Sequence, residues 1–291
     1  MITDVSFLVF TNEMHFSILN LTLPFLIKNV EQLNRPIYVV SNKIPNETRP
    51  VGAEYIDANE PFSSSGHHFR NTLMTAIKHI DSKYVVFMCD DYLVQSAVKA
   101  DRFNGIINMM DDLSIDFFSM ASQKHMEHII PSWKRLDTDL SKYNLPNGCI
   151  YELADYIRHM YSVQTCVWKV SSLITLLSYN ENMSLHELDS TDIRNMRGKR
   201  RTLTAESGFN LYTKDSDFMD YGFRNFCYHL PPLTYNADER AIGSDYFIFD
   251  YIEIVRHGKF IAQNINARTI LHEILSMPEY SAVKQKLVQF M

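Results

Sequence analysis

Glycine and proline are scarce in this sequence: its 291 residues include nine glycines and ten prolines, which leaves little room for linkers. The glycine patterns of phosphate-binding and dinucleotide-binding loops, Gly-x-x-x-x-Gly-Lys and Gly-x-Gly-x-x-Gly, are both absent. The Gly-x-Ser-x-Gly turn of many hydrolases is absent too. Any nucleotide site in this chain must therefore neutralise phosphate charge without a glycine-rich loop, and a metal ion held by carboxylates would do so.

Cysteines are also few, and none of them form a Cys-x-x-Cys pair. The four are widely spaced, at Cys89, Cys149, Cys166 and Cys227. This spacing argues against a zinc ribbon and gives no support for a disulfide framework. We expect reduced and mostly buried thiols.

Long apolar runs are missing as well. The longest is far too short to cross a bilayer, and residues 1–4 contain no basic segment of the kind that begins a signal peptide. We therefore expect a cytoplasmic protein, in the host cytoplasm if the source is viral.

Excess positive charge is absent. The net charge is -6 and the pI is about 6.0, which argues against a protein that coats nucleic acid, although a local basic patch remains open. Hydrophobic residues make up 46% of the chain and charged residues 21%, as in ordinary globular proteins. The length allows one large domain or two small ones.

The feature that stands out is a run of apolar residues at 84–88, followed by Cys89 and then by two adjacent acids, Asp90 and Asp91. Such a run predicts a strand buried on both faces, as in parallel sheets covered by helices. Ligands of open α/β sheets bind at the carboxyl ends of the strands. Because neighbouring carboxylates repel each other, the pair suggests a divalent cation, whereas the alternative is an acidic turn.

Upstream, strands and helices alternate. The patterns predict strands at 5–10, 36–40 and 54–57 and helices at 16–30 and 67–80, which together form a doubly wound nucleotide-binding half. Polar residues at the strand ends and at the start of the second helix are candidates for nucleotide contacts: Thr11, Asn12, Ser41, Asn42 and Arg70.

Downstream, the pattern is less regular. We predict helices at 100–113 and 170–178, strands at 116–120, 163–168 and 247–259, and one or two closing helices within 267–290. Residues 124–153 are rich in His, Trp, Pro and Asn, and we expect irregular structure there.

Four motifs follow one another along the chain: Asp90-Asp91-Tyr92-Leu93, Gln164-x-x-x-Trp168, His186-Glu187, and Val255-Arg256-His257-Gly258-Lys259-Phe260. In this order and spacing, the sequence resembles GT-A glycosyltransferases with an Asp-Asp-Tyr variant of their Asp-x-Asp motif. The resemblance implies an α/β fold: a GT-A (Rossmann-like) mixed sheet flanked by helices, with irregular acceptor-side insertions and a helical C-terminus. It implies one domain, with a nucleotide-binding half at 1–95, an acceptor half at 96–266 and a tail at 267–291.

The resemblance also implies roles for these residues. Asp90 and Asp91 would bind Mn²⁺ or Mg²⁺, which grips the diphosphate of a nucleotide-sugar donor, with a UDP-sugar expected. Because the motif lacks the residue between its acids, it does not say which acid touches the metal. His257 would be a further metal ligand and Lys259 a phosphate contact, although His-Gly-Lys is also a common turn.

Glu187 would be the general base that takes the acceptor's proton, with Asp189 in reserve, although Glu187 also suits a helix start. His186 stands where the family often has Trp or Phe. Gln164 and Trp168 are candidates either for sugar contacts or for core packing.

A basic segment follows the proposed base, with cations at Arg194, Arg197, Lys199, Arg200 and Arg201. It is either a solvated loop or an acceptor-binding surface for an anionic polymer. The second interpretation suits a bacteriophage-type enzyme that glycosylates a hydroxymethylated base in DNA, and a saccharide or a lipid-linked sugar is the alternative acceptor. The competing classes for the whole chain are a nucleotidyltransferase that processes nucleotide sugars and a catalytically inactive nucleotide-binding module. The sequence does not indicate an oligomeric state.

Overall fold

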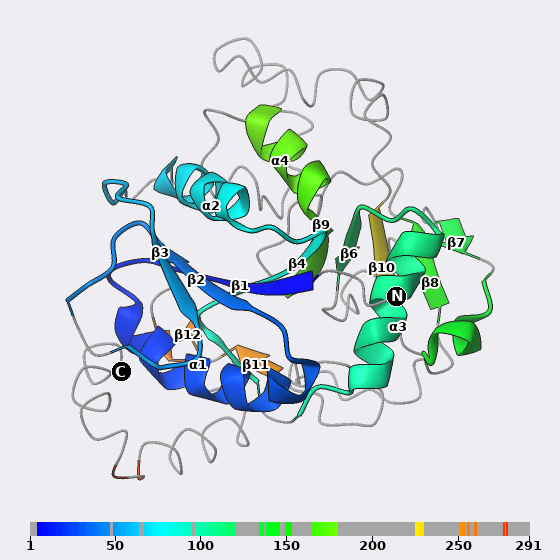
Figure 1. Ribbon diagram of the computed structural model, residues 1–291, viewed down its shortest axis with the longest axis horizontal. Coiled ribbons are helices and arrows are strands. Elements are labelled where there is room, and N and C mark those ends of the chain that lie inside the picture. Colours follow the sequence, from blue (N-terminus) through cyan, green and yellow to red (C-terminus); the bar gives the residue numbers. More distant parts are fainter. Residues whose placement is uncertain are drawn as a thin grey trace.

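The computed structural model describes residues 5–46, 49–63, 67–94, 97–119, 134–136, 138–145, 149–152, 165–179, 225–229, 251–253, 255–256, 259–260, 276 and 278. Within these residues, nine strands form one mixed sheet in the order β3-β2-β1-β4-β9-β6-β10-β8-β7. Helices lie on both faces of this sheet (Figure 1).

The first half of the sheet is parallel. It consists of β1 (Val5–Thr11), β2 (Ile37–Ser41), β3 (Glu54–Asp57) and β4 (Tyr84–Cys89). These are the strands that the sequence predicted, to within one or two residues at each end. β1 is buried along its whole length because both of its faces are covered: Phe7 packs into one core cluster and Leu8 into the other.

The second half of the sheet mixes strand directions. It contains β9 (Cys166–Lys169), β6 (Phe117–Ser119), β10 (Asn225–His229), β8 (Cys149–Glu152) and β7 (Lys134–Leu136). β9 runs antiparallel to both β4 and β6, and β10 is parallel to β6 and antiparallel to β8. The expectation of a mixed sheet is confirmed.

The expectation of irregular structure across residues 124–153 is wrong for part of that segment. β7 and β8 lie within it and pair with each other, and a short 3₁₀ helix, η4 (Leu140–Tyr143), lies between them. Both strands have only three or four residues, and β8 depends on pairing with the distant β10. Local periodicity over so few residues is too weak to reveal them.

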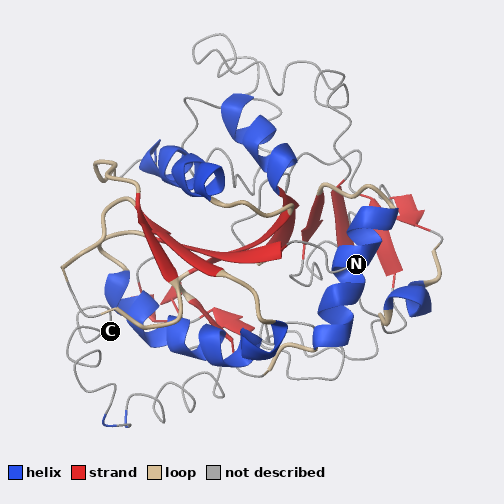
Figure 2. Cartoon of the chain, viewed as in Figure 1, coloured by secondary structure: helices blue, strands red, loops and turns tan. Residues whose placement is uncertain are grey.

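Helices cover the two faces of the sheet separately (Figure 2). One core cluster contains apolar residues of α1 (Phe16–Val30) and α3 (Ala100–Asp112), together with η4. The other contains those of α2 (His67–His79) and α4 (Val170–Tyr179). A short 3₁₀ helix, η1 (Glu31–Leu33), extends α1. The four α-helices of the described residues match the predicted ranges closely.

Two small sheets accompany the main one. β5 (Tyr92–Val94) pairs antiparallel with β11 (Tyr251–Glu253), and β12 (Val255–Arg256) pairs antiparallel with β13 (Lys259–Phe260). The prediction of a single strand at 247–259 is therefore wrong for the described part of that segment. Its residues belong to separate strands: β11 pairs with β5, and β12 pairs with β13, which runs in the opposite direction. A run of apolar residues does not show where one strand ends and the next begins.

The predicted fold class, an α/β fold with a mixed sheet flanked by helices, is confirmed. Of the predicted tail, the structure describes only residues 276 and 278, so the closing helices lie outside the described residues. In the part of the chain that is described, we find no helix that is both long and apolar enough to span a bilayer.

Candidate functional site at the end of β1 and β4

The order of the parallel strands in the sheet reverses between β1 and β4, so the chain leaves these two neighbouring strands toward opposite edges of the sheet. β1 leads through α1 to β2 on one side, whereas α2 leads from β3 to β4 on the other. In open α/β sheets, this switch point at the carboxyl ends of the strands is where ligands bind. Phe10 pairs with Cys89 in the register of the two strands, so Thr11 and Asp90 are the next residues at this edge.

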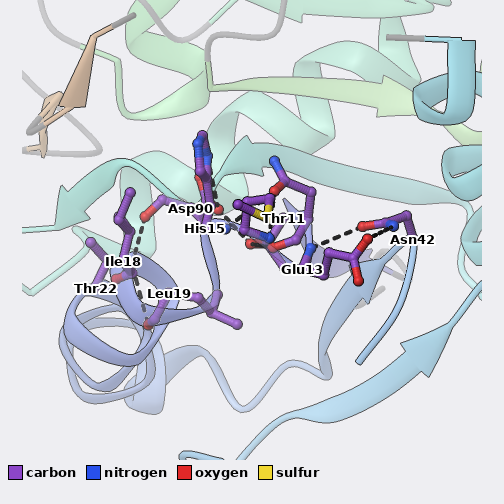
Figure 3. A network of polar contacts seen from close by, with 10 residues as sticks. Thr11, Glu13, His15, Ile18, Leu19, Thr22, Asn42 and Asp90 are labelled. Carbon is purple, nitrogen blue, oxygen red and sulfur yellow. Dashed lines mark hydrogen bonds and ion pairs between the residues drawn. The ribbon is translucent and has the colours of Figure 1, made fainter. Parts of the chain in front are cut away.

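Asp90 is held at this edge by contacts from two elements (Figure 3). Its backbone N–H donates to Phe10 O at 3.0 Å, and its carboxylate Oδ2 accepts a short hydrogen bond from Thr11 Oγ1. Its carbonyl oxygen accepts a hydrogen bond of 2.7 Å from Thr22 Oγ1 of α1. The residue is only 5% exposed, so the first acid of the pair is both buried and fixed.

Burial raises the pKa of Asp90 from 3.8 to about 6. The charge of His15 opposes this rise, as do hydrogen bonds from Thr11 and from nearby backbone N–H groups. The imidazole Nδ1 of His15 lies 3.9 Å from Asp90 Oδ2, at the limit of an ion pair. Near pH 7 the carboxylate is therefore charged in a place where its charge is poorly compensated.

Asp91 follows in the turn between β4 and β5 and is partly exposed. Two adjacent carboxylates supply oxygen ligands that suit a hard divalent cation. Across the described residues, no cluster of three or more His, Cys, Asp or Glu side chains could hold a metal by itself. Mg²⁺ sites commonly use one or two carboxylates together with substrate phosphates and water, so the two acids fit a metal that arrives with a diphosphate.

A second polar network surrounds the end of β2. Asn42 accepts from the backbone N–H of Glu13 at 2.9 Å, and its amide group donates to Glu13 Oε1 at 3.3 Å and to Glu60 O at 3.2 Å. Asn12 Oδ1 accepts from the backbone N–H groups of Met14 and His15, which turns the chain into α1. These asparagines join the loops after β1, β2 and β3.

Two other residues predicted to contact the nucleotide, Ser41 and Arg70, form hydrogen bonds to backbone carbonyl groups of the protein. Ser41 is fully buried, and its hydroxyl donates to Lys43 O at 2.7 Å. Arg70 donates from Nε to Leu177 O at 2.8 Å and so connects α2 to α4. Both side chains have a structural role in this state, and their contact with a nucleotide stays a prediction.

Trp168 lies in the core. Its side chain is 2% exposed, and its ring packs against Phe117 with a centroid distance of 4.6 Å. Its position therefore supports core packing, the second of the two roles considered for Trp168. A side chain buried in this way cannot contact an acceptor.

Several predicted site residues lie outside the described residues: Glu187, Asp189, His257, Arg197, Lys199, Arg200 and Arg201. Lys259 is described as the first residue of β13, where its backbone pairs with Arg256. The structure therefore brings together Thr11 and Asp90 of the predicted set, with Asp91 next in sequence.

Two residues of the site were not predicted. His15 and Thr22 both approach Asp90, from the start and from the second turn of α1. The sequence carries a faint signal for Thr22, a polar residue within the apolar pattern of that helix. Nothing in the local pattern indicates His15, because its partner lies 75 residues away.

No protein-family model matches the chain, and no curated protein sequence matches it. Among solved structures, it is similar to the mannosyltransferase PcManGT from Pyrobaculum calidifontis in complex with GDP-Man and Mn²⁺, with 14% identity, a TM-score of 0.37 and coverage of 60% of this chain and 46% of that one. It is also similar to mannosyl-3-phosphoglycerate synthase from Rubrobacter xylanophilus, with 13% identity, a TM-score of 0.35 and coverage of 70% and 75%. For TarS 1-349 from S. aureus the identity is 13%, the TM-score 0.38 and the coverage 64% and 53%. The chain thus spans about half the length of the first and third of these structures, and similarity at this level does not define a substrate or a reaction.

Proposed function

We propose that the chain is a metal-dependent glycosyltransferase that moves a sugar from a nucleotide diphosphate donor to an acceptor hydroxyl. The observation that carries this proposal is the acid pair after β4: Asp90 is desolvated at the switch point of a parallel sheet, with Asp91 partly exposed beside it. The order of the four sequence motifs supports the same class.

In this proposal both carboxylates bind the metal, and Asp91 is the acid nearer the donor, since it is the more exposed of the two. A bound Mn²⁺ or Mg²⁺ would supply positive charge against the diphosphate as negative charge develops on it. Asp90 fixes the turn from which Asp91 projects, and His257 and Lys259 are the proposed contacts from the β12–β13 segment. The asparagines at the ends of β1 and β2 would border the nucleoside.

Glu187 is the proposed general base, with Asp189 in reserve. A carboxylate in that position would remove the proton from the acceptor hydroxyl as the oxygen attacks the anomeric carbon. Sequence order supports this assignment, since the acidic segment lies between the Trp168 and His257 motifs.

Metal-dependent nucleotide binding is the first test. We expect calorimetry to show binding of a nucleoside diphosphate in the presence of Mn²⁺ and weak or no binding in its absence. Asp91→Asn should weaken the metal-dependent binding by at least about tenfold, because one charged ligand is lost. Asp101→Asn, which changes an exposed acid in the first turn of α3, is the matched control and should bind normally.

Other outcomes would point to the competing classes. Nucleotide binding that ignores both the metal and Asp91→Asn would contradict the metal bridge and favour a binding module. Metal-dependent binding that requires a nucleoside triphosphate, with release of pyrophosphate in the presence of a sugar phosphate, would favour a nucleotidyltransferase.

The acceptor is proposed from the basic segment, whose Arg197, Lys199, Arg200 and Arg201 would contact an anionic polymer such as DNA with hydroxymethylated bases. We expect DNA binding that weakens steeply with salt. Replacing these four residues with alanine should reduce the slope of log K against log salt by up to about four, since each phosphate contact contributes about 0.9.

The matched control replaces Lys28 and Lys78, exposed cations of α1 and α2, with alanine and should leave the slope unchanged. If duplex and single-stranded DNA both fail to bind at low salt, the acceptor is a saccharide, and the glycosyltransferase proposal stands.

A further inference from the structure

The hydroxyls of Thr11 and Thr22 are both directed to Asp90 (Figure 3). The two threonines are 1% and 2% exposed, so neither is placed to meet a ligand from solvent. Thr22 Oγ1 also lies 3.2 Å from Ile18 O and 3.4 Å from Leu19 O, but a hydroxyl has one proton, and the shortest of its contacts is the 2.7 Å bond to Asp90 O.

We infer that Thr11 and Thr22 are positioning residues of the metal site, which act through Asp90 and do not touch the donor. This inference rests on the proposed function. It changes the role of Thr11, which the sequence suggested as a nucleotide contact: Thr11 fixes the carboxylate end of Asp90, and Thr22 fixes its backbone.

The physical reason is the conformational entropy that a metal-binding side chain loses when it becomes fixed. Asp90 is held by Thr11 at the end of β1, by Thr22 in α1 and by the carbonyl of Phe10. A carboxylate that is already fixed loses little conformational freedom when a cation binds. Threonine suits this task because its branched Cβ restricts rotation about χ1.

α1 also secures the chain beyond the acidic turn. Asn29 Nδ2 donates to Val94 O at 2.8 Å, and Val98 N donates to Asn29 O at 2.8 Å. Thr22 and Asn29 are seven residues apart, which places them on the same side of the helix. The segment from Asp90 to Val94, which contains the acidic turn and β5, is therefore bonded at both of its ends to one side of α1.

The test is a titration of Mn²⁺ into the full chain with a saturating nucleoside diphosphate, read by the signal of unbound Mn²⁺ in electron paramagnetic resonance. Thr11→Val and Thr22→Val keep the shape of the side chain and remove the hydroxyl. We expect each to weaken Mn²⁺ binding by about 10- to 100-fold, as is usual when the hydrogen-bond partner of a ligand is removed. Thr11→Ser should restore most of the affinity.

Thr75→Val is the matched control, since Thr75 is exposed on α2 and its hydroxyl bonds only within that helix, to Asn71 O. It should bind Mn²⁺ like the wild type. Unfolding temperatures of all four variants separate a loss of affinity from a loss of fold.

Wild-type affinity in folded Thr11→Val and Thr22→Val would overturn the inference and leave the proposed function intact. Failure of the wild type itself to bind Mn²⁺ with any nucleoside diphosphate would overturn the proposed function, and the inference with it. Weakened binding in Thr11→Ser equal to that in Thr11→Val would also contradict the positioning role, since serine keeps the donor.

Discussion

Replacing Asp90 with asparagine is expected to make the unliganded protein more stable above pH 6 while removing metal-dependent nucleotide binding. Asparagine resembles the protonated acid, keeps an acceptor for Thr11 and avoids burying a charge. We expect a gain of about 1–3 kcal/mol in the free energy of unfolding at pH 8. Stability and function would then make opposite demands on one residue, as is common at binding sites.

The pH dependence follows from the sign of the pKa shift. The pKa of Asp90 is higher in the folded protein, at about 6, than the ordinary value of 3.8, so the folded state binds the proton more tightly. The stability that this contributes is present below pH 3.8 and is lost as the pH rises through 6. Urea unfolding at pH 5 and pH 8 should show the two proteins diverging in stability as the pH rises.

Asp139→Asn is the control, because the pKa of Asp139 is shifted in the opposite direction to that of Asp90. Hydrogen bonds from the Ser141 hydroxyl and backbone lower the pKa of Asp139, so the neutral substitute should bring no gain at pH 8. A variant Asp90→Asn that is less stable than the wild type at pH 8 would contradict the argument, because it would mean that the charged form is well compensated in the fold.

Gly105→Ala is expected to destabilise the fold by about 3 kcal/mol or more. Gly105 lies in α3, where the helix approaches η4 so closely that an added Cβ would lie 1.7 Å from Tyr143 O and 2.8 Å from Tyr143 C. Both are backbone atoms, so no rotamer change can relieve the overlap. Helix propensity alone would favour alanine by about 1 kcal/mol, so a net loss would isolate the effect of the close approach.

Chemical denaturation of the purified variant measures this change. Asn108→Ala is the matched control, since Asn108 is exposed in the same helix and gains the same kind of propensity without a neighbouring backbone. If Gly105→Ala proves as stable as Asn108→Ala, α3 and η4 do not pack as described.

The sequence predicted the parallel half of the sheet well, because three of its strands, β1, β2 and β4, are mainly apolar runs followed by polar residues. In β1, Phe7 and Leu8 face different helical layers, so the buried run is continuous and easy to recognise. The same reasoning placed Asp90 and Asp91 at the end of β4. These are properties of neighbouring residues, which a local pattern can show.

The contacts that organise the site could not be predicted in this way. Thr11 and Asp90 are 79 positions apart, and Thr22 and Asp90 are 68 apart. Their meeting depends on which strands become neighbours and in which register, and the 2.0-residue period of a strand carries no information about its partner. For the same reason, the pairing of β8 with β10 was not visible in the sequence.

The attachment of the acidic turn to α1 limits how this chain can vary in length. Thr22 and Asn29 reach the turn and the end of β5 from positions about two helical turns apart. Inserting or deleting one residue between them would rotate Asn29 by about 100° around the helix axis and move it away from Val94. Insertions and deletions tolerated by a working protein should therefore fall outside residues 22–29, and within that interval the chain can change in composition but not in number of residues.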